Sequence, residues 1–275
     1  MLCPNVTFVV FTYNEQQRIT RVLQNFAGIG PILVVDNDST DQTADIARSF
    51  GATVLLNKNQ GWVEDEVTAA RVKEAVQTDW IYWGFADEMI DHETAGAIAA
   101  AVDSNDYDIV NITRKNYYYG KFCHDAFADR MNRIFRKAAI DFNGNVIHGF
   151  GKVTVPESRI KMLDDRYFVH HFISNVAKSY ILTMDRYTDV QASPSLYRSP
   201  LRLVLASLKM ALTQYVLRGG YKAGPAGAFL TANCAFYGWM LSMKAYEKAH
   251  GVDRPSIEAS NDTVRDHVLQ SFKAK

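Results

Sequence analysis

Two short acidic segments carry the residue types best suited to chemistry. Residues 36–41 (DNDSTD) follow an apolar run and precede a helical pattern, and Asp87 and Glu88 end another apolar run in WIYWGFADEM. Two adjacent carboxylates that face a crevice need a cation or a proton. Mg²⁺ typically binds through one or two carboxylates together with substrate phosphates. Asp87 and Glu88 are therefore candidate metal ligands beside a phosphate-containing ligand.

Both segments also have an ordinary structural interpretation. Asp, Asn and Ser are common in turns and at helix starts, and Asp87 with Glu88 could form a solvated turn before the next helix. Asp36, at a strand end, could instead accept hydrogen bonds from a base or ribose, and the following helix N-terminus favours anions. A calcium loop is excluded because Asp41 and Ala47 stand where Gly and Glu are required.

Strands and helices alternate through the first 120 residues or so. Polar residues mark the helix starts: we expect Asn14 to cap the first helix and Ser39 with Gln42 to form a capping box at the second. The alternation predicts an α/β fold, a mostly parallel sheet flanked by helices. The expected strands are 6–12, 32–35, 53–56, 80–85 and 107–113, and the expected helices are 14–26, 39–50, 64–76 and 93–102.

Such a sheet predicts where a ligand lies. Ligands of open parallel sheets bind beyond the carboxyl ends of the strands. Residues 12–14, 36–41 and 86–88 each follow a strand, so we expect them around one crevice. Arg71 and Lys73, on a helix beside that crevice, could contact a diphosphate, although such residues often only solvate a helix face.

Composition restricts the class of protein. Thirty basic residues balance 30 acidic ones, which gives no electrostatic footprint for nucleic acid. Cys3, Cys123 and Cys234 form no C-x-x-C pair, as is typical of free thiols in a reducing compartment. The first residues carry no basic leader, so we expect no signal peptide and a cytoplasmic location.

The C-terminal part of the sequence is predominantly apolar and helical. Residues 201–217 carry few charges and residues 226–243 none. Eighteen uncharged residues are near the lower limit for a membrane span. We favour packing on the domain, or lying at a membrane surface, over a true span. The expected divisions are 1–118 for the α/β half with these loops, 119–198 for the rest of the same domain, and 199–275 for a helical extension.

Taken together, the motifs resemble family 2 glycosyltransferases, which have the Rossmann-like GT-A fold. The strongest matches are FTYNEQQRI (11–19), ILVVDNDSTDQTADIA (32–47) and DWIYWGFADEMI (79–90). RIFRKAAIDFNGNVIHG (133–149) and QYVLRGGYKAGPAG (214–227) are similar to a bacterial subgroup that adds sugars to lipopolysaccharide cores and related glycans. The resemblance implies inverting transfer from a nucleotide-sugar, with a UDP-sugar expected, to a glycan or glycolipid acceptor. Residues 1–118 would then bind the nucleotide-sugar, and residues 119–198 would form the acceptor side of the same domain.

The resemblance also assigns expected roles to residues of the crevice. Tyr13 and Asp36 would contact the nucleobase, and Asp38 would shape the same site. Asp87 would be the last acid of an Asp-x-Asp element that binds Mg²⁺ or Mn²⁺, assisted by Glu88. The first acid of that element is replaced by Phe85, which puts metal dependence in question. The other residues expected to bind the nucleotide-sugar are Thr12, Asn14, Arg71 and Ala86.

The identity of the general base stays open. Inverting transfer needs a base for the acceptor hydroxyl, and the candidates are Asp125, Asp129, His148 and Glu157. We favour Asp129 or His148, although the subgroup's histidine–glutamate pair is broken because Gly149 follows His148. His170 and His171 alternate along an expected strand, so at most one faces the site.

Two other functions compete with sugar transfer. A nucleotidylyltransferase would need a Gly-rich loop after the first strand, and FTYNEQQRI contains no glycine. A non-catalytic protein that binds a nucleotide-sugar or glycan is compatible with Phe85 and Gly149. Release of nucleoside diphosphate from a sugar donor distinguishes it from an enzyme.

Overall fold

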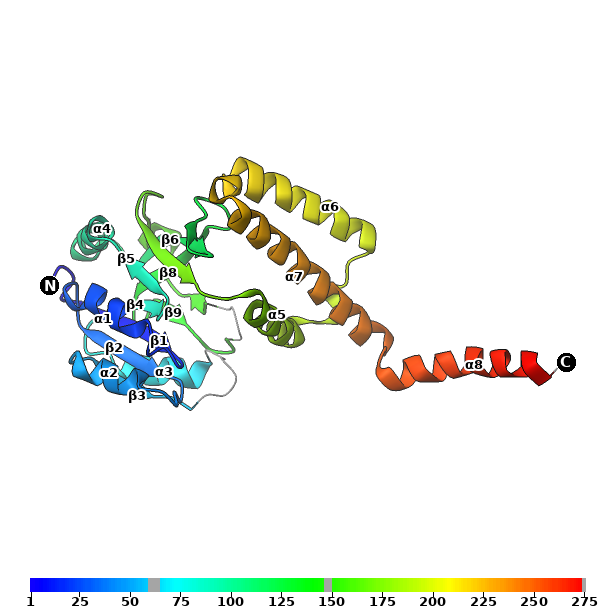
Figure 1. Ribbon diagram of the computed structural model, residues 1–275. Helices are drawn as coiled ribbons and strands as arrows, with labels where there is room; N and C mark the ends of the chain where they lie inside the picture. The colour runs from blue at the N-terminus through cyan, green and yellow to red at the C-terminus, as the bar shows by residue number, and fades with distance from the viewer. Residues whose placement is uncertain (59–64, 146–149, 274–275) are drawn as a thin grey trace. The chain divides into compact units, whose positions relative to one another are not determined.

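The protein divides into two compact units, Met1–Ser174 and Asn175–Lys275. The computed structural model describes residues 1–58, 65–145 and 150–273 (Figure 1). The second unit begins earlier than the helical extension expected from residue 199, because helix α5 (Ala177–Gln191) belongs to it.

Within the described residues, a ten-stranded mixed sheet forms the centre of the first unit. Its main path runs β3-β2-β1-β4-β8-β6-β12-β5, and β7 and β11 each pair with β6. The first four strands of this path are parallel, as expected, whereas β8 runs antiparallel to both neighbours. The strands are β1 (Val6–Thr12), β2 (Ile32–Asp36), β3 (Thr53–Leu56), β4 (Trp80–Phe85), β5 (Glu88–Ile90), β6 (Ile109–Tyr118), β7 (Lys121–Phe122), β8 (Asp129–Arg136), β11 (Ile160–Met162) and β12 (Phe168–Ile173).

Helices cover both faces of this sheet, so the α/β prediction is confirmed. On one face α1 (Ile19–Ala27), α2 (Thr43–Ser49) and α4 (His92–Asp103) pack on residues such as Phe8. On the other face α3 (Glu66–Ala75) packs around residues such as Trp83. β1 is buried along its whole length, which explains its almost continuous apolar sequence. A separate antiparallel pair, β9 (Ile140–Asp141) with β10 (Lys152–Val153), and a 3₁₀ turn (Glu157–Arg159) also belong to the unit.

The expected caps of the first two helices are wrong. Helix α1 begins at Ile19 and α2 at Thr43, and neither has a side-chain cap. Asn14 has a φ of 55°, and its side chain contacts the loop after β2 instead of a helix start. The later helices are capped by acids: the carboxylates of Asp65 and Asp91 accept hydrogen bonds from the backbone of α3 and α4.

The second unit is helical. After α5 come α6 (Pro200–Met210), a π-helical segment (Ala211–Leu217), α7 (Pro225–His250) and α8 (Arg254–Lys273). Short 3₁₀ turns lie at Pro194–Leu196 and Gly220–Ala223. Within the described residues, no helix combines the length and apolar character needed to cross a bilayer.

Candidate active site

Three loops meet at one edge of the sheet, as the sequence predicts. Strand β1 lies between β2 and β4, with Thr12 opposite Asp36 and Phe11 opposite Phe85. All three strands are parallel, so the loops that follow them leave the same edge. The residues that approach a ligand there follow Thr12, Asp36 and Phe85 directly in the sequence.

The first two loops are tied together by side chains. Thr40 donates its backbone N–H to the Asn14 amide oxygen at 2.8 Å, and Asn14 donates its own N–H to the Ser39 hydroxyl at 2.9 Å. Glu15 donates its backbone N–H to the Thr43 hydroxyl at 2.8 Å. Asn14 therefore connects the loop after β1 with the loop after β2. Its expected contact with a ligand stays a prediction.

Asp36 is the last residue of β2 and lies at this edge of the sheet. Its side chain is buried and accepts hydrogen bonds from the hydroxyl and the backbone N–H of Ser39. Thr12, its neighbour on β1, is also buried, and its hydroxyl has no hydrogen-bond partner among the described residues. Tyr13 is half-buried, Ala86 is buried, and Asp38 is exposed with a φ of 65°.

Arg71 is anchored on the far side of Asp36. Its guanidinium donates to the Asn57 side chain at 2.8 Å and to the Leu56 carbonyl at 2.7 Å. Asn57 in turn donates to Asn37, directly after Asp36. Arg71 is thus held at the ends of β2 and β3. Lys73 points elsewhere, because its ammonium donates to the Ile140 carbonyl at 2.6 Å.

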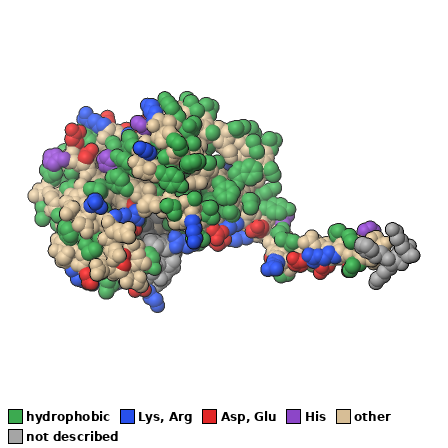
Figure 2. Space-filling view, in the orientation of Figure 1, with side chains coloured by type: hydrophobic (Ala, Val, Ile, Leu, Met, Phe, Trp, Pro, Cys, Tyr) green, Lys and Arg blue, Asp and Glu red, His purple; other side chains and the backbone are tan. Residues whose placement is uncertain are grey.

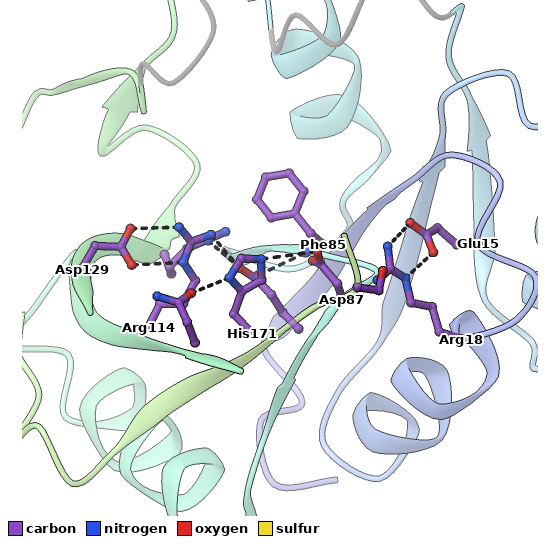
Figure 3. Close-up of polar contacts among 11 residues, drawn as sticks. Glu15, Arg18, Phe85, Asp87, Arg114, Asp129 and His171 are labelled. Atoms are coloured by element: carbon purple, nitrogen blue, oxygen red, sulfur yellow. Dashed lines mark hydrogen bonds and ion pairs between the residues drawn. The ribbon is translucent and has the colours of Figure 1, made fainter. Parts of the chain in front are cut away.

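Asp87 faces a histidine that comes from a distant strand. The Nε2 of His171, on β12, lies 3.3 Å from the Asp87 carboxylate, and both side chains are partly exposed (Figure 3). The Nδ1 of His171 lies 2.7 Å from the Asn116 side-chain oxygen, and the Asn116 amide donates to the Phe127 carbonyl. Because that oxygen can only accept, Nδ1 carries a proton and Nε2 is directed at Asp87.

The charges around Asp87 favour its ionised form. Burial acts to raise the pKa of Asp87, but the hydrogen bond and charge of His171, with Arg18 and Arg114, hold it below the usual value. Arg18 forms an ion pair with Glu15 beside this position (Figure 3). Burial raises the pKa of Glu15, and Arg18 opposes that rise. These three positive partners therefore keep Asp87 as a carboxylate.

Glu88 does not face the crevice, contrary to expectation. Its side chain is fully buried, with Arg133 at 2.7 Å and Arg114 at 3.3 Å, and it accepts the backbone N–H of Phe85. A buried carboxylate with these partners is a structural ion pair. The Phe85 ring lies over the Arg133 guanidinium, 5.1 Å from ring centroid to charge, in the place of the missing first acid.

The candidate general bases differ in their ion-pair partners and in their exposure. Both oxygens of Asp129 accept from Arg114 at 3.0 Å, which ties β8 to β6. Asp125 forms a 2.9 Å ion pair with Lys115, and Glu157 is exposed at the start of a 3₁₀ turn. His148 lies outside the described residues.

His171 and Arg18 are the residues that sequence reasoning did not select. Alternation along β12 indicated that one histidine of the pair could face the site, and His171 does so. His170 lies on the opposite face, with its Nδ1 3.0 Å from the Tyr117 hydroxyl. Choosing between them required the register of β12 on β5, which pairs His171 with Glu88.

A glycosyltransferase fold is consistent with this arrangement, and comparison with known proteins identifies the class. The model of glycosyl transferase family 2 matches residues 7–152, more than half of the chain. The chain therefore belongs to glycosyl transferase family 2, and the expected GT-A architecture is the fold that the sheet and its helices form.

Three curated relatives are similar over limited regions. An uncharacterised glycosyltransferase of Rickettsia typhi is 33% identical over 103 residues, 37% of this chain and 34% of the relative. The prophage-derived glycosyltransferase SunS of Bacillus subtilis is 28% identical over 149 residues, 52% of this chain and 34% of the relative. Protein RfbJ of Shigella flexneri is 43% identical over 53 residues, 18% of this chain and 41% of the relative. The chain thus matches less than half of each relative's length.

Solved structures show a more distant similarity. The mannosyltransferase PcManGT of Pyrobaculum calidifontis, in complex with GDP-Man and Mn²⁺, has a TM-score of 0.47 and 14% identity, covering 91% of this chain and 88% of that one. TarS of S. aureus in complex with UDP-GlcNAc has a TM-score of 0.44 and 16% identity, covering 67% and 65%.

Proposed function

We propose that this protein transfers a sugar from a nucleoside diphosphate donor to a hydroxyl group of a glycan or glycolipid. The observation that carries the proposal is the position of Asp87, opposite His171 and at the same sheet edge as Asp36. Family 2 membership supports the reaction type. The resemblance to the lipopolysaccharide-core subgroup supports inversion, a bacterial surface glycan as acceptor and a cytoplasmic location.

The residues at the edge fit a divalent cation. Asp87 and the Nε2 of His171, 3.3 Å apart, would hold the ion, which would take the place of the proton that Nε2 directs at the carboxylate. Asn116 fixes the Nδ1 proton of His171, as outer partners of metal-binding histidines commonly do. The described residues contain no group of three or more metal-binding side chains, so donor phosphates and water would complete the coordination. Such an ion supplies positive charge next to the leaving diphosphate.

The chain's own residues would orient the donor. The buried Asp36 carboxylate lies at the end of β2, and the Thr12 hydroxyl, which has no hydrogen-bond partner among the described residues, lies beside it on β1. Both offer hydrogen bonds to a nucleoside. Tyr13, Asp38 and Ala86 border the same region, and Arg71 stands at its far side. Arg18, which raises the positive charge near Asp87, is placed to neutralise a phosphate.

Acceptor activation is assigned to Asp129 or His148. Asp129 is 41% exposed, but Arg114 holds both its oxygens. For Asp129 to remove a proton, that ion pair has to open when the acceptor binds. A base of this kind contributes roughly 10²–10⁴-fold to the rate.

The test is nucleoside diphosphate release. The protein is incubated with UDP-, GDP- and dTDP-sugars, Mg²⁺ or Mn²⁺ and acceptor extracts, and release is followed with time. We expect release with one donor and its abolition in a folded Asp87→Asn variant. Phe85 favours a second candidate, a binding protein without turnover, and donor binding without any release would establish it.

A further inference from the structure

The helical unit carries an exposed stripe of leucines on α6 and the π-helical segment. Leu201, Leu205, Leu208 and Leu212 are 69%, 56%, 62% and 55% exposed. On a helical projection the four lie within an arc of about 60°. Apolar side chains scattered singly on a surface are ordinary, but four on one line form a contiguous strip that marks an interaction surface.

The stripe is not the side by which α6 packs in its own unit. That side carries Leu203, which is buried, and Ser207, whose hydroxyl accepts from the Trp239 indole of α7 at 3.1 Å. On the projection both residues lie roughly opposite the leucines. Helix α6 is therefore apolar on two sides: among the described residues, one side packs on α7 and the other is exposed.

The charge around the stripe has one sign. Residues 190–246 contain no Asp or Glu but six basic residues. Lys244 is paired with Asp185 and Asp189, and the other five are exposed. Arg202 and Lys209 border the stripe on the same side of α6, about two helical turns apart. The five exposed residues are Arg198, Arg202, Lys209, Arg218 and Lys222.

We propose that the leucine stripe and its basic border form a docking surface for an anionic phospholipid membrane. Helices that lie in the membrane interface combine an apolar face with Lys and Arg beside it, and anionic lipids attract those cations. A second copy of this chain would bring the same positive charge to the stripe and be repelled. Figure 2 shows hydrophobic side chains gathered over α6 and α7.

The segment that follows suits the same partner. At the turn between the π-helical segment and α7, Leu217 and Tyr221 are 71% and 51% exposed, next to Arg218 and Lys222. Tyrosines are enriched where protein meets the membrane–water boundary. This surface contains none of the residues assigned to sugar transfer, so it stands independently of the proposed function.

The experiment is co-sedimentation of the full chain with vesicles. Vesicles of phosphatidylcholine alone are compared with vesicles in which about a third of the lipid is phosphatidylglycerol. We expect binding to the anionic vesicles that weakens as salt is added. The double variants Leu205→Gln/Leu208→Gln and Arg202→Glu/Lys209→Glu should each weaken it by about 20-fold or more.

Matched controls use similar exposed residues elsewhere. Leu56→Gln/Met162→Gln and Arg21→Glu/Lys178→Glu should leave vesicle binding unchanged, and circular dichroism should show all variants folded. The proposal is overturned if both vesicle types bind equally, or if the stripe variants bind like the controls. Self-association that buries the stripe, with no vesicle binding, would also overturn it. Donor turnover, measured in parallel, reports on sugar transfer separately.

Discussion

At the residue scale, the pairing of Asp87 with His171 is the arrangement with the most direct chemical consequence. If His171 binds a cation through Nε2, the His171→Ala variant loses an imidazole ligand while Asp87 remains. We expect its Mn²⁺ affinity in the presence of nucleoside diphosphate to fall by more than the roughly 10–100-fold that loss of an outer-shell partner costs. Titration calorimetry measures this affinity.

His170 provides the control for that change. It is the adjacent residue on β12, but its side chain lies on the other face, beside Tyr117. His170→Ala should leave Mn²⁺ affinity unaltered. Equal losses in the two variants would mean that the strand was perturbed, and no loss in either would remove His171 from the metal site.

Asp129 permits a second prediction at this scale. If Asp129 is the general base, the Asp129→Asn variant should have a kcat lower by about 10²-fold or more, with little change in donor affinity. If Asp129 only holds Arg114 in place, the same variant should keep a kcat within a few-fold of that of the unmodified protein. The acceptor-dependent rate at saturating donor separates these outcomes. Asp165→Asn, which breaks a comparable ion pair with Arg130 of the same strand, is the matched control.

At the element scale, the strands with strong local signals were predictable. Val6–Thr12 and Trp80–Phe85 are strands with the bounds that their apolar runs predict. Helix starts were less predictable, because Asn14 and Ser39 have the right types for caps but bond to each other's loops. Local sequence does not reveal which long-range partner a polar side chain will find.

The candidate site shows the same difference between features that local sequence predicts and features that depend on long-range contacts. The convergence of three loops depends only on parallel strand order, so the sequence predicted it. The burial of Glu88 depends on Arg133, and the approach of His171 depends on the pairing of β12 with β5. Both contacts join residues far apart in the chain, which hydrophobic periodicity does not encode.

The two glycines of α7 permit an element-scale prediction. A Cβ at Gly227 would lie 1.9 Å from the Gly220 carbonyl oxygen, whereas a Cβ at Gly238 would meet no atom within 4 Å. Gly227→Ala therefore forces a backbone shift and should destabilise the helical unit by about 1–3 kcal/mol. Gly238→Ala should stabilise the same helix by about 0.5–1 kcal/mol. Hydrogen exchange of α7 amides measures both, and matching signs would contradict the close approach of α7 to that turn.

At the scale of the whole molecule, paired carboxylates link stability to pH. The hydrogen bond from Arg159, with the nearby charges of Arg159 and Arg136, lowers the pKa of Asp108 below 3.8 despite partial burial. The Thr113 hydroxyl and Arg130 do the same for Asp165. A lowered folded-state pKa means that the unfolded chain binds more protons in acid. These contributions are therefore complete above the unfolded-state pKa and are lost as pH falls through the folded-state values.

The unfolding free energy of the protein should accordingly fall steeply below about pH 4. Burial also lowers the pKa of His170, against the opposing charge of Asp91, so a smaller loss should begin already below the ordinary histidine value of 6.5. Urea unfolding at a series of pH values measures both phases. In Asp108→Asn the acid phase should be shallower, whereas Asp45→Asn, at an exposed site, should keep it unchanged. An unaltered acid phase in Asp108→Asn would show that this ion pair does not link the fold to pH, since removal of a paired carboxylate must remove its share of proton uptake.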